Sequence, residues 1–191
     1  MTNEVSLNIF SVHLTKPLFQ TTIKEPEMAA LEAGVASPEF TLTDLDGSVR
    51  NKEDLHRNGL MFAAFYKVGC GTCQFTAPYL EKFYQAYQDR EGFQFWGISQ
   101  DSVDDTNSFM NEYGGTFPNL IDETHWASAD YGLTNVPAMF LVDESGLIKE
   151  SCVGFSRDDL NRMSHLVANH LGVEPEVISD ANDGAPSLKP G

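Results

Sequence analysis

The chain has 191 residues, with 28 acidic against 12 basic side chains and a formal net charge of −16 at pH 7. Phosphate binding needs a basic surface, so this charge excludes nucleic acid as an expected partner. Hydrophobic residues make up 41% of the chain and aromatic residues 11%, which is enough to build a core and excludes a wholly disordered chain. Three cysteines are too few for a structural disulfide framework, so a close pair is expected to be catalytic or metal-binding.

The first residues show no basic region followed by a long apolar one, and no signal peptide is expected. No run approaches the roughly 18 apolar residues that a membrane span needs. We therefore expect a cytoplasmic protein with no membrane partner. Composition divides the chain into an N-terminal extension at residues 1–33, a folded domain at 34–172 and a tail at 173–191. The tail has almost no apolar content, which predicts disorder.

The folded domain begins with a predicted hairpin. Residues 40–43 alternate as a half-buried strand does, Asp46-Gly47 is a turn dipeptide, and residues 48–50 form the returning arm. Residues 52–56 are expected to form one or two helical turns. Residues 60–66 are apolar at every position, which predicts a central strand covered on both faces.

A helix and a second strand follow. Aromatic side chains recur at every fourth position from Phe75 to Tyr87, which is typical of one buried helix face. Residues 93–99 form the second strand. Ser102 begins the next helix, which ends before Gly114-Gly115, and residues 117–122 form a short extended piece.

The end of the domain combines a short helix, a hairpin and a closing helix. The helix is expected at residues 123–131, and residues 138–142 and 147–153 form the antiparallel hairpin. Ser156 caps the closing helix, whose apolar stripe ends at Leu171. This order of strands and helices implies a mixed α/β sheet with helices on both faces.

Three further side chains are expected in the core. Trp96 and Trp126 are large aromatic residues of the predicted strand and helix, and Cys152 lies within a predicted strand. A free cysteine in a strand is often buried as a small hydrophobic residue.

Cys70 and Cys73 form a pair with two residues between them, directly after the buried strand and at the start of the next helix. Unpaired backbone N–H groups and the helix dipole favour a thiolate at a helix N-terminus. A second thiol one turn further on can attack a mixed disulfide made by the first. The pattern therefore predicts thiol–disulfide exchange. Half of a metal site is a weaker alternative, because no second pair completes four ligands, and an inert pair is the other.

Further segments carry a family resemblance. The stretch from Cys70 to Pro78 resembles the active-site segment of thioredoxins, and Asn135-Val136-Pro137-Ala138 falls where that superfamily carries its cis-proline. Three segments resemble the redoxin (AhpC/TSA) branch, which holds TlpA-like thiol–disulfide oxidoreductases and peroxiredoxins; they are residues 36–42, 98–102 and 117–122. The resemblance covers roughly residues 34–171.

The resemblance implies an α/β thioredoxin fold, a mixed central sheet flanked by helices, with an N-terminal β-hairpin added. It implies that Cys70 attacks a disulfide and Cys73 resolves the mixed disulfide. Substrate binding is expected at four residues: Gly71, Thr72, Val136 and Pro137. A cis Val136–Pro137 bond would present backbone groups to an extended substrate. The expected partners are a disulfide-containing protein or small molecule and an upstream thiol reductant, with no metal and no cofactor.

Departures from the family pattern keep alternatives open. Peroxiredoxins carry Thr three residues before their reactive Cys and an Arg near the cis-proline position, whereas this chain has Lys67 and Pro137. Related exchange proteins carry an acid where this chain has Ala64 or Thr76, so the usual proton acceptor for Cys73 is missing. Lys67 is expected to be solvated. A thiol peroxidase and a non-enzymatic adaptor that binds through the N-terminal extension are the alternative functions.

Overall fold

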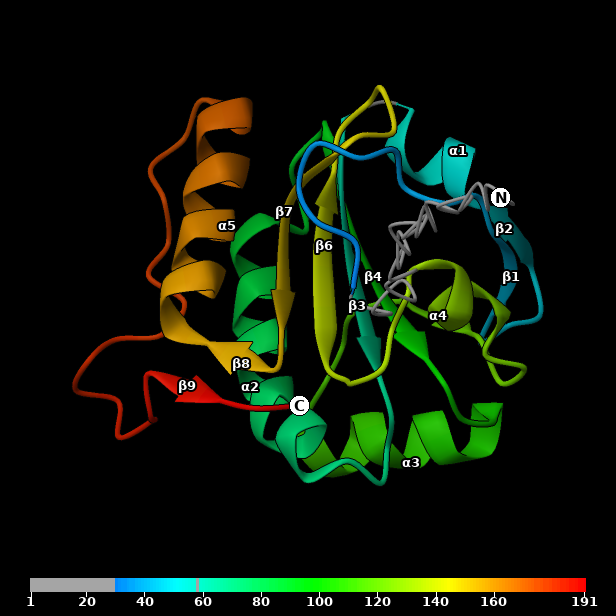
Figure 1. Ribbon diagram of the computed structural model, residues 1–191. Coiled ribbons are helices and arrows are strands. Elements are labelled where there is room, and N and C mark those ends of the chain that lie inside the picture. Colours follow the sequence, from blue (N-terminus) through cyan, green and yellow to red (C-terminus); the bar gives the residue numbers. More distant parts are fainter. Residues whose placement is uncertain (1–29, 58) are drawn as a thin grey trace, which may run out of the picture.

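The structure is a computed structural model that describes residues 30–57 and 59–191. Most of the predicted N-terminal extension, residues 1–29, therefore lies outside the described residues. The described chain forms a seven-stranded sheet in the order β2-β1-β5-β4-β3-β6-β7 and a separate two-stranded sheet of β8 and β9 (Figure 1). The strands are β1 (Thr41–Asp44), β2 (Val49–Asn51), β3 (Leu60–Tyr66), β4 (Phe93–Ser99), β5 (Asn119–Ile121), β6 (Ala138–Val142), β7 (Ile148–Val153), β8 (Phe155–Ser156) and β9 (Leu188–Lys189).

Strand β3 occupies an interior position in the sheet. It pairs in parallel with β4 and antiparallel with β6. Strand β5 is parallel to β4, whereas β1 pairs antiparallel with both β2 and β5, and β7 pairs antiparallel with β6. Tyr66 of β3 is in register with Ser99 of β4, and Phe65 with Ala138 of β6. The residues that follow β3 and β4 and those that precede β6 therefore meet at one edge of the sheet.

The alternation of side chains along β3 divides the apolar interior in two. Phe62 and Ala64 belong to one buried cluster, and Met61, Ala63 and Phe65 belong to the other. All seven residues of β3 are buried, which confirms the prediction of a strand covered on both faces.

Five helices flank the sheet in the described part of the chain: α1 (Lys52–His56), α2 (Gly71–Tyr87), α3 (Val103–Tyr113), α4 (Trp126–Asp130) and α5 (Arg157–Leu171). Apolar residues of α2, α3 and α5 pack into the first cluster, and those of α1 and α4 into the second. Figure 1 shows α5 on one side of the sheet and α1 and α4 on the other. This arrangement confirms the predicted mixed sheet with helices on both faces.

Two helix starts follow the predicted capping chemistry. The Ser102 hydroxyl accepts a hydrogen bond from the Asp105 backbone N–H at 3.2 Å, and the Ser156 hydroxyl accepts one from that of Asp159 at 3.3 Å. Each cap satisfies an N–H group that has no partner within its own helix.

Two expectations differ from the structure. Trp126 was expected in the core, but its side chain is 74% exposed, and this prediction is wrong. The tail at residues 173–191 was expected to be disordered, whereas the structure gives it defined contacts. Ile178 and Ser179 are each 1% exposed, and the tail contributes β9, which pairs with β8.

No helix of the described residues combines the length and the apolar character that a bilayer span requires. Within the same residues, no three His, Cys, Asp or Glu side chains gather closely enough to hold a metal ion.

Candidate active site

The N-terminus of α2 places the two cysteines at the edge of the sheet. Cys70 is the N-cap residue of α2 and has an extended backbone conformation, and its Sγ accepts a hydrogen bond from the Cys73 backbone N–H at 3.3 Å. The cap therefore brings the Cys70 sulfur over the first turn of the helix, where free N–H groups stabilise a negative charge.

The loop between β3 and α2 is held by two side chains. Asp101 Oδ2 accepts a hydrogen bond from the Val68 N–H at 2.8 Å, and Gln74 Nε2 donates one to the Val68 carbonyl oxygen at 2.9 Å. Asp101 lies two residues beyond Ser99, which is in register with Tyr66, so the parallel pairing of β3 and β4 brings it to this loop. These contacts fix the backbone that leads into Cys70.

The loop before β6 supplies the other wall of the site. The Cys70 thiol donates a hydrogen bond to the Val136 carbonyl oxygen at 3.3 Å, and the Val136–Pro137 peptide bond is cis. Because β6 runs antiparallel to β3, its first residues stand at the carboxyl end of β3, beside the dithiol. The structure therefore brings Cys70, Cys73, Val136 and Pro137 together.

The two thiols have different surroundings. Cys70 is partly exposed, whereas Cys73 is 2% exposed. Burial raises the pKa of the Cys73 thiol far above its ordinary value. Cys70 and the Asp101 carboxylate raise this pKa further, whereas a hydrogen bond with the Lys67 backbone lowers it. Cys70 is therefore the more accessible thiol of the pair, whereas Cys73 lies beneath the surface of the site.

Gly71 and Thr72 contact the C-terminal segment of the same chain. Lys189 Nζ donates a hydrogen bond to the Gly71 carbonyl oxygen at 3.3 Å, and the Thr72 hydroxyl donates one to the Pro190 carbonyl oxygen at 2.7 Å. All six site residues predicted from the sequence thus lie around one site. The C-terminal segment, which composition predicted to be disordered, lies there as well.

Asp101 is a functional candidate that sequence reasoning missed. Ala64 and Thr76 stand where related proteins carry an acid; both are buried, and the Thr76 hydroxyl donates to the Thr72 carbonyl oxygen at 2.7 Å. Lys67 is exposed, as predicted. The Asp101 carboxylate is the acidic group that influences the Cys73 thiol. Its position directly after β4, the parallel neighbour of β3, is the signal that could have identified it.

Cys152 has no place in this site. It lies on β7, is 4% exposed, and its thiol donates to the Gly154 carbonyl oxygen at 3.6 Å. Burial, followed by the nearby Asp159 carboxylate, raises the pKa of the Cys152 thiol to about 12. These surroundings confirm the predicted core packing.

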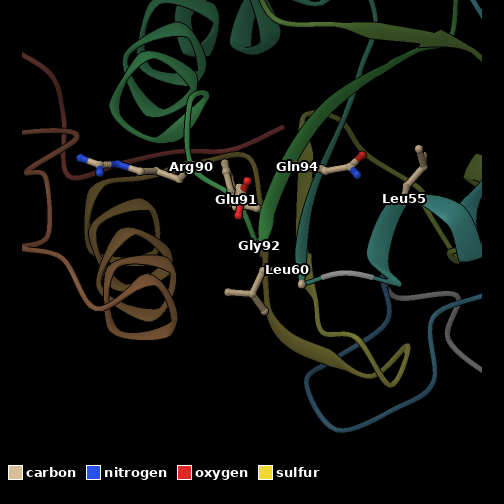
Figure 2. A pocket seen from close by; sticks show the side chains of 8 residues that line it. Leu55, Leu60, Arg90, Glu91, Gly92 and Gln94 are labelled. Carbon is tan, nitrogen blue, oxygen red and sulfur yellow. The ribbon is translucent and has the colours of Figure 1, made fainter.

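A pocket of about 430 Å³ lies at the opposite end of the sheet. It is lined by residues around the start of β3 and β4, among them Leu55, Leu60, Arg90 and Gln94 (Figure 2). Each of the two strands has seven residues, so about 20 Å of strand separates this pocket from the dithiol. The pocket is therefore not part of the candidate active site.

Comparison with known proteins identifies the family. A model of the AhpC/TSA family matches residues 33–151. The chain is 30% identical over 125 residues to the thiol-disulfide oxidoreductase ResA of Bacillus thuringiensis, covering 65% of this chain and 71% of that protein. It is 28% identical over 138 residues to ResA of Geobacillus thermodenitrificans, covering 71% of this chain and 78% of that protein.

A solved structure gives the same answer for the fold. The thioredoxin domain of a thiol-disulfide oxidoreductase from Bacteroides vulgatus matches with a TM-score of 0.64 and 27% identity, over 72% of this chain and 99% of that domain. This match confirms the thioredoxin fold expected from the sequence. The chain belongs to the AhpC/TSA family, in the redoxin branch of the thioredoxin superfamily, and it is an oxidoreductase.

Proposed function

We propose that the protein catalyses thiol–disulfide exchange through Cys70 and Cys73. The observation that carries this proposal is the asymmetry of the pair: Cys70 is partly exposed at a helix N-terminus, and Cys73 is buried one turn further along. The relatives named thiol-disulfide oxidoreductases support the same chemistry. The substrates are disulfide-containing proteins or small molecules, and a thiol reductant restores the dithiol.

The reaction begins when Cys70 loses its proton. Its thiolate attacks one sulfur of the substrate disulfide, which forms a Cys70–substrate disulfide and expels the other substrate sulfur as a thiolate. The Cys73 thiol then gives up its proton and attacks Cys70 Sγ. This second step forms the Cys70–Cys73 disulfide and releases the remaining substrate thiolate. Two electrons pass from the dithiol to the substrate, and exchange with the reductant reverses both steps.

The site geometry supports distinct roles for the surrounding residues. The Val136 carbonyl oxygen contacts the Cys70 sulfur, so the Val136–Pro137 loop would position an extended substrate beside it. The Gly71 carbonyl oxygen and the Thr72 hydroxyl would offer it further hydrogen-bonding groups. Burial keeps the Cys73 thiol protonated until the mixed disulfide forms, because the raised pKa disfavours its thiolate in the resting enzyme. The Asp101 carboxylate is the acceptor that we assign to the Cys73 proton.

Trapping tests this assignment. A Cys73→Ser variant should accumulate a mixed disulfide through Cys70 when mixed with a disulfide-linked peptide, because the resolving thiol is gone. A Cys70→Ser variant is the matched control and should accumulate none. Mass spectrometry of the protein after quenching with acid measures both. An untrapped Cys70 would reject exchange, and peroxide consumption faster than that of a free thiol would favour a peroxidase instead.

A further inference from the structure

The C-terminal segment at residues 188–191 lies across the face of the dithiol. Its first two residues form β9, which pairs antiparallel with β8, with Lys189 opposite Phe155 and Leu188 opposite Ser156. The Arg157 backbone N–H donates to the Ser187 carbonyl oxygen at 3.0 Å, just before β9. The segment therefore reaches the site as an extended strand (Figure 1).

The contacts of this segment fall on the residues that the proposed function assigns to substrate. Lys189 Nζ reaches the Gly71 carbonyl oxygen at 3.3 Å and lies 4.8 Å from the centroid of the Phe75 ring. The Pro190 carbonyl oxygen accepts the Thr72 hydroxyl at 2.7 Å. One lysine is thus held by a carbonyl oxygen and an aromatic face together.

Gly191 lies beside the Cys70 sulfur. Asn135 Nδ2 donates to the Gly191 carbonyl oxygen at 3.0 Å. A Cβ atom added to Gly191 would lie 2.7 Å from the Val136 carbonyl oxygen, the atom that accepts the Cys70 thiol at 3.3 Å. Gly191 therefore occupies space next to Cys70 into which a substrate cysteine would have to come.

A glycine in the surface beneath the segment lets the two backbones approach closely. Gly154 has a φ of 78°, and a Cβ atom there would lie 2.6 Å from the Lys189 carbonyl oxygen. Any larger residue at this position would push the segment away. Beyond Val136, a pocket of about 250 Å³ continues the path, lined by residues that include Gln100, His125 and Asn135.

We infer that residues 188–191 occupy the binding track of an extended polypeptide substrate and compete with it in cis. The inference rests on the proposed exchange function and adds to it a substrate class. The favoured partner is a polypeptide disulfide with a basic side chain placed over Phe75, as Lys189 is. Its chain continues past Val136 into the adjacent pocket.

The segment can leave without unfolding the rest of the tail. Strand β9 has two residues, and Leu188 is 60% exposed. The preceding tail has separate anchors on α5: Arg157 donates to the Ala185 carbonyl oxygen at 2.6 Å, and Asn161 to that of Ser179 at 2.8 Å. A substrate can therefore displace residues 188–191 while these anchors stay in place.

The rate of Cys70 alkylation measures how far residues 188–191 shield this thiol, and it does not require enzymatic activity. The reduced protein is treated with a bulky maleimide, and labelling of Cys70 is followed by mass spectrometry. Deletion of residues 188–191 should raise the rate about tenfold, because three side-chain hydrogen bonds, the contact of Lys189 with Phe75 and the β8–β9 pairing are lost together. Lys189→Ala should raise it about two- to fivefold. Lys149→Ala removes an exposed lysine on β7 and should leave the rate unchanged.

Two further arms define the substrate class. A synthetic Ser-Leu-Lys-Pro-Gly peptide should slow labelling of the deletion variant, and the same peptide with Ala for Lys should do so more weakly. The deletion variant should also reduce a lysine-containing peptide disulfide faster than the full chain does. Equal labelling rates for the deletion variant and the full chain, with equal unfolding midpoints, would overturn the inference.

The outcomes separate this inference from the proposed function. If Cys73→Ser is trapped but the deletion variant is labelled no faster than the full chain, residues 188–191 do not shield Cys70, and the exchange function still stands. Faster labelling of the deletion variant without any trapping would support a covered Cys70 but reject exchange, and with it the inferred substrate class.

Discussion

The buried thiol of Cys152 predicts a specific loss of stability at alkaline pH. Its ordinary pKa of 9.0 is raised to about 12 in the folded protein, mainly by burial. Above about pH 9 the unfolded chain releases this proton and the folded chain does not, so rising pH favours the unfolded state. The contribution is fully present below pH 9 and is lost progressively as pH rises towards about 12.

The size of the effect follows from the difference between the two pKa values. Each pH unit in this window changes the free energy of unfolding by about 1.4 kcal/mol for one group. Between about pH 8 and about pH 10.5, the Cys152 thiol should therefore cost the folded state about 2 kcal/mol. Other groups that titrate in this range, Cys73 among them, are shared by the natural chain and a Cys152 variant and cancel in their difference.

Urea unfolding of Cys152→Val measures this difference. Valine is apolar, suits a strand and has a similar volume, so the two proteins should differ by less than about 1 kcal/mol at pH 8. At about pH 10.5 the variant should be more stable than the natural chain by about 2 kcal/mol relative to that baseline. An equal decline in both proteins would refute the reasoning. Trapping through Cys70 should be unchanged, because Cys152 lies outside the site.

Two other predictions concern the polar contacts that support the dithiol. The Tyr66 hydroxyl donates to Asn119 Oδ1 at 2.7 Å and both residues are 1% exposed, so Tyr66→Phe should lower the free energy of unfolding in urea by about 1–3 kcal/mol. The control Tyr113→Phe, at the partly exposed end of α3, should lower it by less than about 0.5 kcal/mol. Equal losses in the two variants would contradict a stabilising role for the Tyr66–Asn119 hydrogen bond. Asp101→Asn should lower the pKa of Cys73 in an NMR titration of its Cβ, while burial still holds that pKa above its ordinary value. Asp101→Ala should also lower the Cys73 pKa, and it should lose about 1.5–3 kcal/mol of stability because the hydrogen bond to Val68 is removed. An unchanged Cys73 pKa in both variants would show that Asp101 does not act on Cys73.

Much of the fold could be predicted because local patterns and tertiary burial agree. Strand β3 is apolar at every position and is buried at every position, and the Ser156 cap begins α5 where a serine three residues before an acid indicates it. The cis-proline loop and the cysteine pair came together because β6 runs antiparallel to β3. The strand and the helix cap depend on short-range sequence signals, whereas the meeting of the cis-proline loop with the cysteine pair depends on strand pairing and was expected from the family resemblance.

The missed features depend on contacts between distant segments. Trp126 lies in a helix of five residues, which is too short for a periodic pattern to show which face is buried. Asp101 reaches the site only through the parallel pairing of β4 with β3. The tail was judged by its low apolar content, but polar groups hold it, such as the Arg157 and Asn161 side chains that bond its carbonyl oxygens. Composition does not report such hydrogen bonds.

The outer strands of the main sheet have a consequence for self-association. Unpaired edge strands can recruit further strands and start aggregation. Here β2 has three residues, and its Arg50 is bound to Asp44 of β1. At the other edge, the start of β7 is already engaged, because Gly34 donates to the Ile148 carbonyl oxygen at 2.8 Å and Ile148 donates to that of Val35 at 2.9 Å. Within the described residues, one edge therefore offers another chain a strand of only three residues, and the other edge is already occupied at its start.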